Sequence, residues 1–566
     1  MAKIHSLSIK NFRGINQFDY VFGFSTFICL IGEGDSGKST ILDAINYVMY
    51  PNWNLSFSDS DFHNGNLDLP IEIEATIYDF DEKLISLDKY GTHIRGINKT
   101  TLEIEDDIDT QIPALTIQLS VKRDLEPIWT IVNDRQDPIQ IKYTDRMKMK
   151  VTMISEYIDR HFSWNKGGIL YRLLKENNPE AKLKNEDNPV IESLRIAKSK
   201  IDENPREDFQ TTIESISESI IKLGFKPNDL NTSIDIGEFS NLDNRFFLFD
   251  EKNPLRTKGK GTKRLLSIAI QLEYSKEGGI ILIDEIEQGL EPHRVMYLAK
   301  ALKENNGGQV FITTHSRNVI TELTINDIFR LEKGVTHNLY NSPDVNFTQG
   351  TIRANPDSFF GKAVIVCEGA TEVGIIRGIN NYLISIEEKP LSMRGITYAD
   401  GKGGDQFITY SKVFNKLGFH VATFCDSDVA GINSKKASLR LLGIEVFDCE
   451  ESYCTEVQIF HFLPWETIEK MPILQEQSKK DAISSQIQNL QYKSIDINDL
   501  TNLGEEQKVN LRKAIGLAAH KGNWYKNITE GEYLGELIMQ NLNTLEQSNP
   551  LKKQFTNIMN WINGLN

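Results

Sequence analysis

The stretch STFICLIGEGDSGKSTILDAINYVMY, residues 25–50, indicates an apolar strand, a glycine-rich loop and a helix, in that order. The loop satisfies the spacing GxxxxGK[ST]. Its glycines let backbone N–H groups surround phosphates, and the N-terminus of the helix adds a favourable dipole. We expect Lys38 to reach the terminal phosphates of a nucleotide and Ser39 to bind Mg²⁺. The residues expected to bind the nucleotide are Gly32, Gly34, Gly37, Lys38, Ser39 and Thr40.

Two later strands supply the groups that a hydrolysing nucleotide site needs. The segment GGIILIDEIEQGLEPH, residues 278–293, indicates a strand that ends in Asp284 and Glu285. We expect Asp284 to support Mg²⁺ and Glu285 to polarise the attacking water. The strand QVFITTHS, residues 309–316, ends at His315, which is placed to sense or orient the terminal phosphate. A histidine at the end of a strand is more often structural, so this role depends on its neighbours.

Length and composition set the broad class of the chain. Its 566 residues are too many to fold around one hydrophobic core, and this length predicts roughly three or four domains. The net charge of −16 disfavours indiscriminate binding to nucleic acid without excluding DNA. The five cysteines are odd in number and form no CxxC pair, which argues against a disulfide framework and a structural zinc site. The start of the sequence lacks the apolar segment of a signal peptide, and no apolar run approaches a membrane span, so we expect a cytoplasmic protein without membrane contact.

A second group of acids follows two apolar strands in the C-terminal half. The segment VIVCEGATEV, residues 364–373, places Glu368 at the end of a strand and Glu372 one helical turn further on. The segment HVATFCDSDVAG, residues 420–431, places Asp426 and Asp428 at the end of another strand. Four carboxylates at one edge of a parallel sheet predict a site for Mg²⁺ or Mn²⁺. Zinc is not expected, because no His or Cys stands at a matching spacing.

The first 345 residues resemble the ABC-type ATPase head of the SMC and RecF-like proteins. The likeness rests on the phosphate loop, on IILIDE at 280–285, on GLEPH at 289–293 and on His315. The signature segment of that family is replaced here by TKGKGTKRLLSIAI, residues 257–270, and we would look for its Q-loop in SDSDFHNG near Asp61. Helical periodicity between the two parts of the head indicates a compact insertion. The resemblance implies that this insertion serves dimerisation; the alternative is that its helices cover the core of the head.

The order EGxTE and then DxD resembles the Toprim domain. An ABC-type head followed by a Toprim domain resembles the OLD (overcoming lysogenisation defect) family of nucleases, including the Gabija-type and retron-associated phage-defence enzymes. The resemblance adds Glu456, in CTEVQIF, and Lys521, in AAHKGNWYKN. It implies that Glu368, Glu372, Asp426, Asp428 and Glu456 hold two cations, that these activate water and stabilise the leaving 3′-oxygen of DNA, and that Lys521 offsets the charge of the phosphate.

The expected fold is therefore α/β: an ABC-type ATPase domain with a helical insertion, then a parallel-sheet Toprim domain and a helical C-terminal part. The expected boundaries are 1–150 and 233–350 for the ATPase, 151–232 for the insertion, 351–470 for the Toprim domain and 471–566 for the helical region. The expected function is an ATP-regulated, metal-dependent DNA endonuclease in anti-phage defence. The expected partners are DNA, further copies in a homodimer or tetramer, and a defence-system protein or retron RNA or DNA. The alternatives are an ATP-switched scaffold and a topoisomerase-like DNA repair enzyme.

Overall fold

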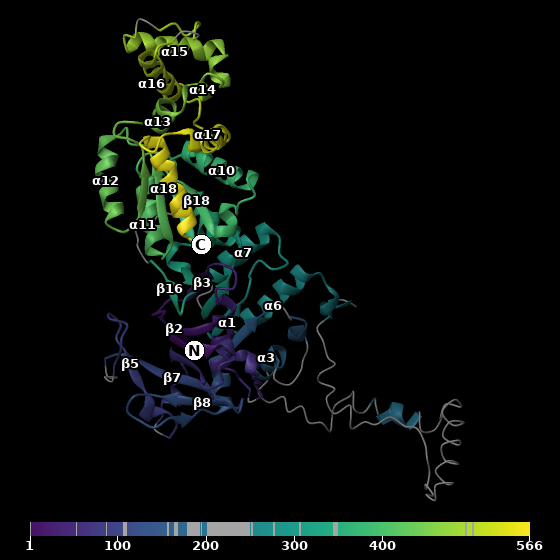
Figure 1. Ribbon diagram of the computed structural model, residues 1–566. Helices are drawn as coiled ribbons and strands as arrows, with labels where there is room; N and C mark the ends of the chain where they lie inside the picture. The colour runs from purple at the N-terminus through teal and green to yellow at the C-terminus, as the bar shows by residue number, and fades with distance from the viewer. Residues whose placement is uncertain are drawn as a thin grey trace, which may run out of the picture.

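The computed structural model is an α/β protein whose described residues form a large mixed sheet, a separate four-stranded sheet and a two-stranded hairpin (Figure 1). We call residues 2–342 the N-terminal half and residues 349–565 the C-terminal half. The structure describes residues 2–177, with gaps at 53, 87, 106–109, 156–157 and 163–167; residues 193, 195–200 and 249–250; and residues 253–565, with gaps at 276–277, 305–306, 343–348, 493–494 and 501–502.

One large mixed sheet organises the N-terminal half. Its strands follow the order β10-β13-β14-β3-β15-β16-β2-β1-β4-β7-β5-β6, and β8 and β9 extend it from β7. The side chains of β3, β13 and β14 are all buried, as expected for parallel strands that are covered on both faces. The outer strands β1 and β7 alternate between buried and more exposed positions, as in an antiparallel sheet with one solvated face.

The bounds of the sheet strands are β1 Lys3–Phe12, β2 Ile15–Val21, β3 Phe27–Ile31, β4 Ile71–Tyr78, β5 Arg95–Ile97, β6 Ile104–Glu105, β7 Ile112–Val121, β8 Pro127–Val132, β9 Ile139–Gln140, β10 Val151–Ile154, β13 Ile280–Ile283, β14 Gln309–Thr313, β15 Ile328–Glu332 and β16 Thr336–Tyr340; a short hairpin adds β11 Phe249–Asp250 and β12 Asn253–Pro254. The helices of this half are α1 Lys38–Val48, α2 Tyr143–Arg146, α3 Ile169–Asn177, α6 Lys260–Tyr274, α7 Pro292–Lys303 and α8 Arg317–Glu322.

The C-terminal half contains a separate four-stranded sheet in the order β18-β17-β19-β20, with all strands parallel. Its strands are β17 Ala363–Cys367, β18 Ile396–Asp400, β19 His420–Cys425 and β20 Glu445–Asp448. Its helices are α9 Gln349–Ala354, α10 Ala370–Ser385, α11 Gln406–Lys416, α12 Ala430–Arg440, α13 Thr455–Phe462, α14 Trp465–Ile468, α15 Gln477–Asn489, α16 Glu505–Lys521, α17 Ile528–Asn541 and α18 Pro550–Gly564. The expected α/β class, with a mixed sheet, a separate parallel sheet and C-terminal helices, is confirmed.

A close helix pair joins the end of the chain to the start of the parallel sheet. Gly374 and Gly378 of α10 face Gly531 and Gly535 of α17, and a Cβ at Gly374 would lie 2.7 Å from the Cα of Gly531. The absence of side chains at both surfaces lets the two backbones approach. Because α10 begins directly after β17, this contact holds the C-terminal helices near the ends of the strands.

The two halves share part of their core. Val364 and Val366 point from β17 into a cluster that also contains Ile312 and Val319 of the N-terminal half, whereas Ile365 belongs to a cluster with the C-terminal helices. Successive strand residues face opposite sides of a sheet, so β17 contributes to both clusters. The two halves are therefore packed together through an apolar interface.

Arg330 of β15 adds polar contacts to this interface. The side chain is 3% exposed and donates to the carbonyl oxygens of Leu417 at 3.3 Å and Gly418 at 2.8 Å. Its guanidinium lies 4.2 Å from the centre of the Phe419 ring. A buried charge needs such partners, because an unpaired one is strongly destabilising.

The sheet of the N-terminal half continues past the expected boundary at residue 150, because β10 pairs with β13. Most of the expected insertion at 151–232 lies outside the described residues, so its proposed role in dimerisation stays a prediction. Among the helices that the structure describes, none is both long enough and apolar enough to span a bilayer.

Arg330→Met should weaken the contact between the halves, because it removes the donor and leaves buried carbonyl oxygens without a partner. We expect the free energy of unfolding in denaturant to fall by about 1.5–3 kcal/mol. Arg317→Ala is the matched control, since its ion pair with Asp357 is solvent-exposed and is worth less than about 1 kcal/mol. Equal losses in the two variants would contradict the role of Arg330.

Candidate functional site

Four predicted acids line one pocket of 520 Å³ at the carboxyl ends of the parallel strands. Glu368 directly follows β17, Glu372 lies in the first turn of α10, and Asp426 and Asp428 follow β19. We call this pocket the acidic pocket. It is lined by Glu368, Gly369, Ala370, Thr371, Glu372, Asp400, Lys402, Gly403, Gly404, Asp426, Asp428, Val429, Ile432, His520 and Lys526.

Backbone and hydroxyl donors orient the acids. The N–H of Asp426 donates to Glu368 Oε2 at 3.0 Å, and the N–H of Gly369 donates to Glu372 Oε2 at 3.0 Å. Thr455 donates to Asp426 Oδ1 through its N–H at 2.6 Å and its hydroxyl at 2.5 Å. Sequence reasoning missed Thr455, although it directly precedes the predicted Glu456.

Burial and neighbouring acids disfavour ionisation of these carboxyl groups in the metal-free pocket. Burial, then the charge of Asp426, raises the pKa of Glu368 to about 7. The same two causes raise the pKa of Glu372 well above its usual range, and burial raises that of Asp426. A nearby cation stabilises the ionised form of carboxyl groups whose pKa is raised in this way. A set of oxygen donors alone suits Mg²⁺ or Mn²⁺. The donor set therefore fits a hard divalent cation.

The acids share a pocket without forming a closed ligand shell. Within the described residues, one group of three potential ligands has its atoms within 4.8 Å of one another, and it is Cys454, Glu456 and His520 rather than any three of the four acids. Mutual repulsion between carboxylates favours this separation. The acidic oxygens have to move closer together to hold one cation jointly.

Two lysines lie beside the acids. Lys436 of α12 is 1% exposed and donates to the carbonyl oxygen of Asp426 and to Ser427 Oγ. These bonds support the turn between Asp426 and Asp428. Lys526 lines the acidic pocket, and its Nζ lies 3.4 Å from Glu456 Oε1. Burial would lower the pKa of Lys526, but Glu456, Asp426 and Glu372 outweigh it and raise the pKa, so the group is charged.

The placement of Lys521 differs from the expectation. Its Nζ donates to Gln486 Oε1 at 3.0 Å on α15, and Lys521 is not among the residues that line the acidic pocket. The reason is that α16 continues to Lys521, whose side chain packs toward α15, whereas Lys526 lies in the turn that leads to α17. Both lysines belong to the stretch AAHKGNWYKN, and the α10–α17 contact brings the second one to the acids.

Glu456 lies behind the pocket wall. It is fully buried, and its Oε2 is 3.2 Å from His520 Nδ1. Burial alone would raise the pKa of Glu456, but the hydrogen bond with His520 and the charge of Lys526 outweigh it and lower the pKa to about 2. Glu456 therefore orients His520 and Lys526, and it has to exchange these contacts to ligate a cation.

Most of the predicted nucleotide residues line a second pocket, of 450 Å³, at the end of β3; Gly32 and Asp284 are not among its lining residues. Gly32 has φ +147°, and a Cβ there would lie 2.5 Å from the carbonyl oxygen of Leu331, so the loop requires glycine. The buried Lys38 donates to the carbonyl oxygens of Gly32 at 3.1 Å and Glu33 at 2.6 Å. This pocket is lined by Gly14, Gly34, Asp35, Ser36, Gly37, Lys38, Ser39, Thr40, Glu285, Thr313, His315 and Lys333.

The two predicted acids meet the phosphate loop here. Asp284 Oδ1 accepts hydrogen bonds from Ser39 Oγ at 3.0 Å and Thr313 Oγ1 at 2.6 Å, the arrangement needed for a shared Mg²⁺. Glu285 has φ +47°, which is unusual for a residue with a side chain and is found at strained functional positions. Burial and the charge of Lys38 lower the pKa of His315, so its imidazole is neutral near pH 7.

The structure places both the segment that replaces the signature and the expected Q-loop segment near Asp61. The segment that replaces the signature forms α6 from Lys260, and Gly261 packs against the carbonyl oxygen of Gly289, where a Cβ would come within 2.4 Å. Asp61 accepts a hydrogen bond from Arg13 Nε at 2.9 Å and does not line the nucleotide pocket. Its placement gives no support to a Q-loop at this position.

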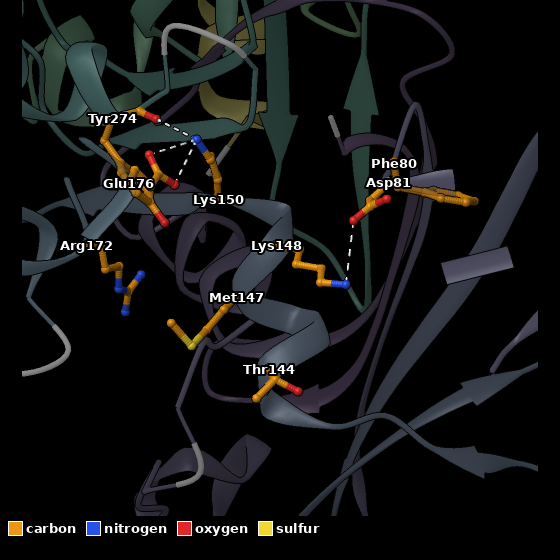
Figure 2. Close-up of a pocket in the computed structure, with 9 residues that line it drawn as sticks. All are labelled: Phe80, Asp81, Thr144, Met147, Lys148, Lys150, Arg172, Glu176 and Tyr274. Atoms are coloured by element: carbon orange, nitrogen blue, oxygen red, sulfur yellow. Dashed lines mark hydrogen bonds and ion pairs between the residues drawn. The ribbon is translucent and has the colours of Figure 1, made fainter. Parts of the chain in front are cut away.

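A third pocket, of 610 Å³, lies beside α2, α3 and α6 (Figure 2). Figure 2 shows Lys150 reaching Glu176, with Nζ 3.0 Å from Oε1, and Lys148 reaching Asp81 at 3.5 Å. Lys150 and Lys148 are thus each paired with a carboxylate that lines the same pocket. We assign no chemistry to this pocket.

Glu368→Gln should change how stability depends on pH in the metal-free protein. A carboxyl whose folded-state pKa is raised stabilises the fold below its unfolded pKa, and this contribution is lost as the pH rises through about 7. The variant should therefore unfold at a higher temperature than wild type near pH 8 and at nearly the same temperature near pH 5. Each 1 kcal/mol gained corresponds to roughly 2–4 °C.

Glu451→Gln is the control for that measurement, because Glu451 is an exposed acid of the same half. Calorimetry of both variants in a chelating buffer checks the prediction. If Glu368→Gln unfolds at a lower temperature than wild type near pH 8, the protein stabilises the ionised Glu368 carboxylate without a metal, which contradicts the prediction.

Comparisons with known proteins find a matching family model in each half of the chain. Residues 27–321 match the family model described as AAA domain, putative AbiEii toxin, Type IV TA system, and residues 359–428 match that of the overcoming lysogenization defect protein-like TOPRIM domain. No curated protein sequence matches the chain.

Several solved structures are similar to part of this chain. An Smc head from Pyrococcus furiosus bound to the C-terminal domain of ScpA is 14% identical, covers 60% of this chain and 96% of its own, and has a TM-score of 0.34. The SMC head domain from Thermotoga maritima is 15% identical, with coverages of 60% and 100% and a TM-score of 0.29. The recombination mediator RecF with ATP is 14% identical, with coverages of 58% and 97% and a TM-score of 0.30. Because the ATPase model spans more than half of the chain and the Toprim model follows it, the chain belongs to the OLD-type family in which an ATPase domain is joined to a Toprim domain.

Proposed function

We propose that the protein is an ATP-regulated, divalent-metal-dependent DNA endonuclease. The observation that carries this proposal is the acidic pocket, where buried carboxylates with raised pKa values face the charged Lys526. A bound Mg²⁺ or Mn²⁺ supplies Lewis-acid stabilisation of charge and a more acidic water in such a site. We place this activity in anti-phage defence by the resemblance to the OLD family.

The residues of the pocket have separable roles in this proposal. Glu368, Asp426 and Asp428 hold the cations, and Glu372 completes the acidic wall. Lys526 contacts a phosphodiester oxygen and offsets the negative charge that develops on it. Thr455 and Lys436 keep Asp426 in place through the bonds described above.

A contact chain links the nucleotide pocket to the acidic pocket. The ring of His315 lies 6.2 Å from that of Phe360, and Phe360 ends a short helical turn just before β17. Arg317 Nη1 also pairs with Asp357 of this turn at 3.3 Å. A nucleotide that moves His315 would therefore push on the segment that leads to Glu368, and we propose that ATP regulates cleavage through this turn.

An ATP-switched scaffold without nuclease activity is the second candidate. The observation that favours it is the separation of the acidic oxygens, since no three of the four acids place one oxygen each within 4.8 Å of the others in the described chain. A cleavage assay with added metal decides between the two functions.

Cleavage of supercoiled plasmid in Mg²⁺ or Mn²⁺ tests the nuclease. Glu368→Ala should abolish nicking, and Lys526→Met should lower the rate roughly 10²–10³-fold, because it removes a charge aimed at the reacting phosphate. Lys521→Met is the matched control and should cleave as wild type does, since Lys521 contacts Gln486. Nicking that survives Glu368→Ala would reject the assignment, and no cleavage by wild type with either metal would favour the scaffold.

The regulatory role of ATP is tested with two variants. Glu285→Gln should slow ATP hydrolysis roughly 10²-fold or more, since it removes the group that polarises water. Phe360→Ala should leave ATP hydrolysis and nucleotide-free cleavage intact but abolish the change in cleavage that ATP produces in wild type. Glu451→Ala, at an exposed acid of the same half outside this contact chain, controls for surface changes. A wild-type response to ATP in Phe360→Ala would exclude this route.

A further inference from the structure

Three side chains from separate parts of the sequence meet beside the acidic pocket. Cys454 caps the N-terminus of α13, Glu456 lies in its first turn, and His520 lies in the last turn of α16. One sulfur, one oxygen and one nitrogen of these residues lie within 4.8 Å of one another. Cys454 is 4% exposed and Glu456 is fully buried, whereas His520 also lines the acidic pocket.

The packing of α13 against α16 holds this group together. A Cβ at Gly516 would lie 2.7 Å from the Cα of Val457, so glycine lets the two helix backbones approach closely. His520 is four residues after Gly516 and therefore lies on the same face of α16. The three groups are thus held together by the backbone of two helices rather than by a mobile loop.

The donor set differs from that of the acidic pocket. A thiol, an imidazole and one carboxylate are ligands for Zn²⁺ and related transition metals, whereas Mg²⁺ prefers oxygen donors alone. We propose that Cys454, Glu456 and His520 form a Zn²⁺-class site that is distinct from the hard-cation site of the four acids. The open fourth position is taken by water on the side of His520 that faces the pocket.

Binding at this site has a defined proton and charge balance. The Cys454 thiol and His520 Nδ1, whose hydrogen faces Glu456 Oε2, each give a proton to the buffer as the sulfur and Nδ1 bind the ion, and Nε2 keeps its hydrogen. Glu456 exchanges its contacts with His520 and Lys526 for the metal. Lys526 Nζ, now 3.4 Å from Glu456 Oε1, is repelled by the ion and moves away from that carboxylate.

This movement gives the site a regulatory consequence, which rests on the proposed nuclease function. Lys526 is the lysine that we assign to the phosphate, and its position depends on Glu456. A transition-metal ion at the new site therefore changes the position of Lys526 without occupying the site of the four acids. We infer that Zn²⁺ inhibits cleavage that Mg²⁺ supports.

Co²⁺ absorption spectroscopy tests the site without reference to nuclease activity. Co²⁺ added to the full-length protein in excess Mg²⁺ should give a thiolate-to-metal charge-transfer band and the visible bands of four-coordinate Co²⁺. Cys454→Ser should lose the charge-transfer band. In competition with a chromophoric chelator, Cys454→Ser and His520→Ala should each lower Zn²⁺ affinity by at least the roughly 10–100-fold seen when a supporting residue of a metal ligand is lost.

Cys449→Ser is the matched control, because Cys449 is another buried cysteine nearby whose sulfur faces Thr455 and Gln554. It should keep the wild-type spectrum and affinity. If wild type gives no charge-transfer band, or if Cys454→Ser still gives one, the proposed site is rejected.

Plasmid cleavage in Mg²⁺ tests the regulatory consequence separately. One equivalent of Zn²⁺ should inhibit wild type and Cys449→Ser but not Cys454→Ser. If Zn²⁺ inhibits wild type, Cys449→Ser and Cys454→Ser equally, it does not inhibit cleavage through this site, even where the spectra show that the site exists. Absence of cleavage by wild type in Mg²⁺ or Mn²⁺ without Zn²⁺ contradicts the proposed nuclease and the regulation that rests on it, whereas the spectra still decide whether the Zn²⁺-class site exists.

Discussion

The crowding of buried negative charge at the ends of β17 and β19 is the constraint on which the C-terminal half depends. Glu368, Glu372 and Asp426 occupy one pocket, and their pKa values are raised because burial and mutual repulsion disfavour ionisation. A fold retains such a cost where the charge has a use, and binding a divalent cation is the use that fits oxygen donors. The donors Thr455 and Lys436 hold the acids in place without neutralising all of them.

The C-terminal helices complete this arrangement. The glycine contact between α10 and α17 brings the segment after α16 to the strand ends, and Thr371 Oγ1 donates to the carbonyl oxygen of Tyr525 at 2.8 Å. Lys526 therefore reaches the pocket although it lies 158 residues after Glu368 and 100 residues after Asp426 along the chain. The shared core and Arg330 then connect this half to the half that holds the nucleotide pocket, so packed contacts run between two sites of different chemistry.

Local patterns in the sequence predicted the parts of the fold that depend on local chemistry. The glycine loop with Lys38 and Ser39, the strand ends at Asp284 and Asp426, and the α/β class all follow from spacing and apolar runs. The resemblance predicted Lys521, whereas Lys526, five residues later, lines the pocket, because spacing in the sequence does not show where α16 ends. The group of Cys454, Glu456 and His520 has no spacing signal either, since its members meet only through the packing of α13 on α16. Such tertiary contacts are set by helix packing, which a linear pattern does not encode.

Anomalous diffraction from crystals grown with Mn²⁺ tests the central claim most directly. The account predicts an anomalous peak inside the acidic pocket, with oxygens of Glu368 and Asp426 drawn together around it, and loss of that peak in Asp426→Asn. A well-ordered pocket without a peak, with the carboxylates still apart at saturating Mn²⁺, would contradict the claim that these acids jointly hold a cation.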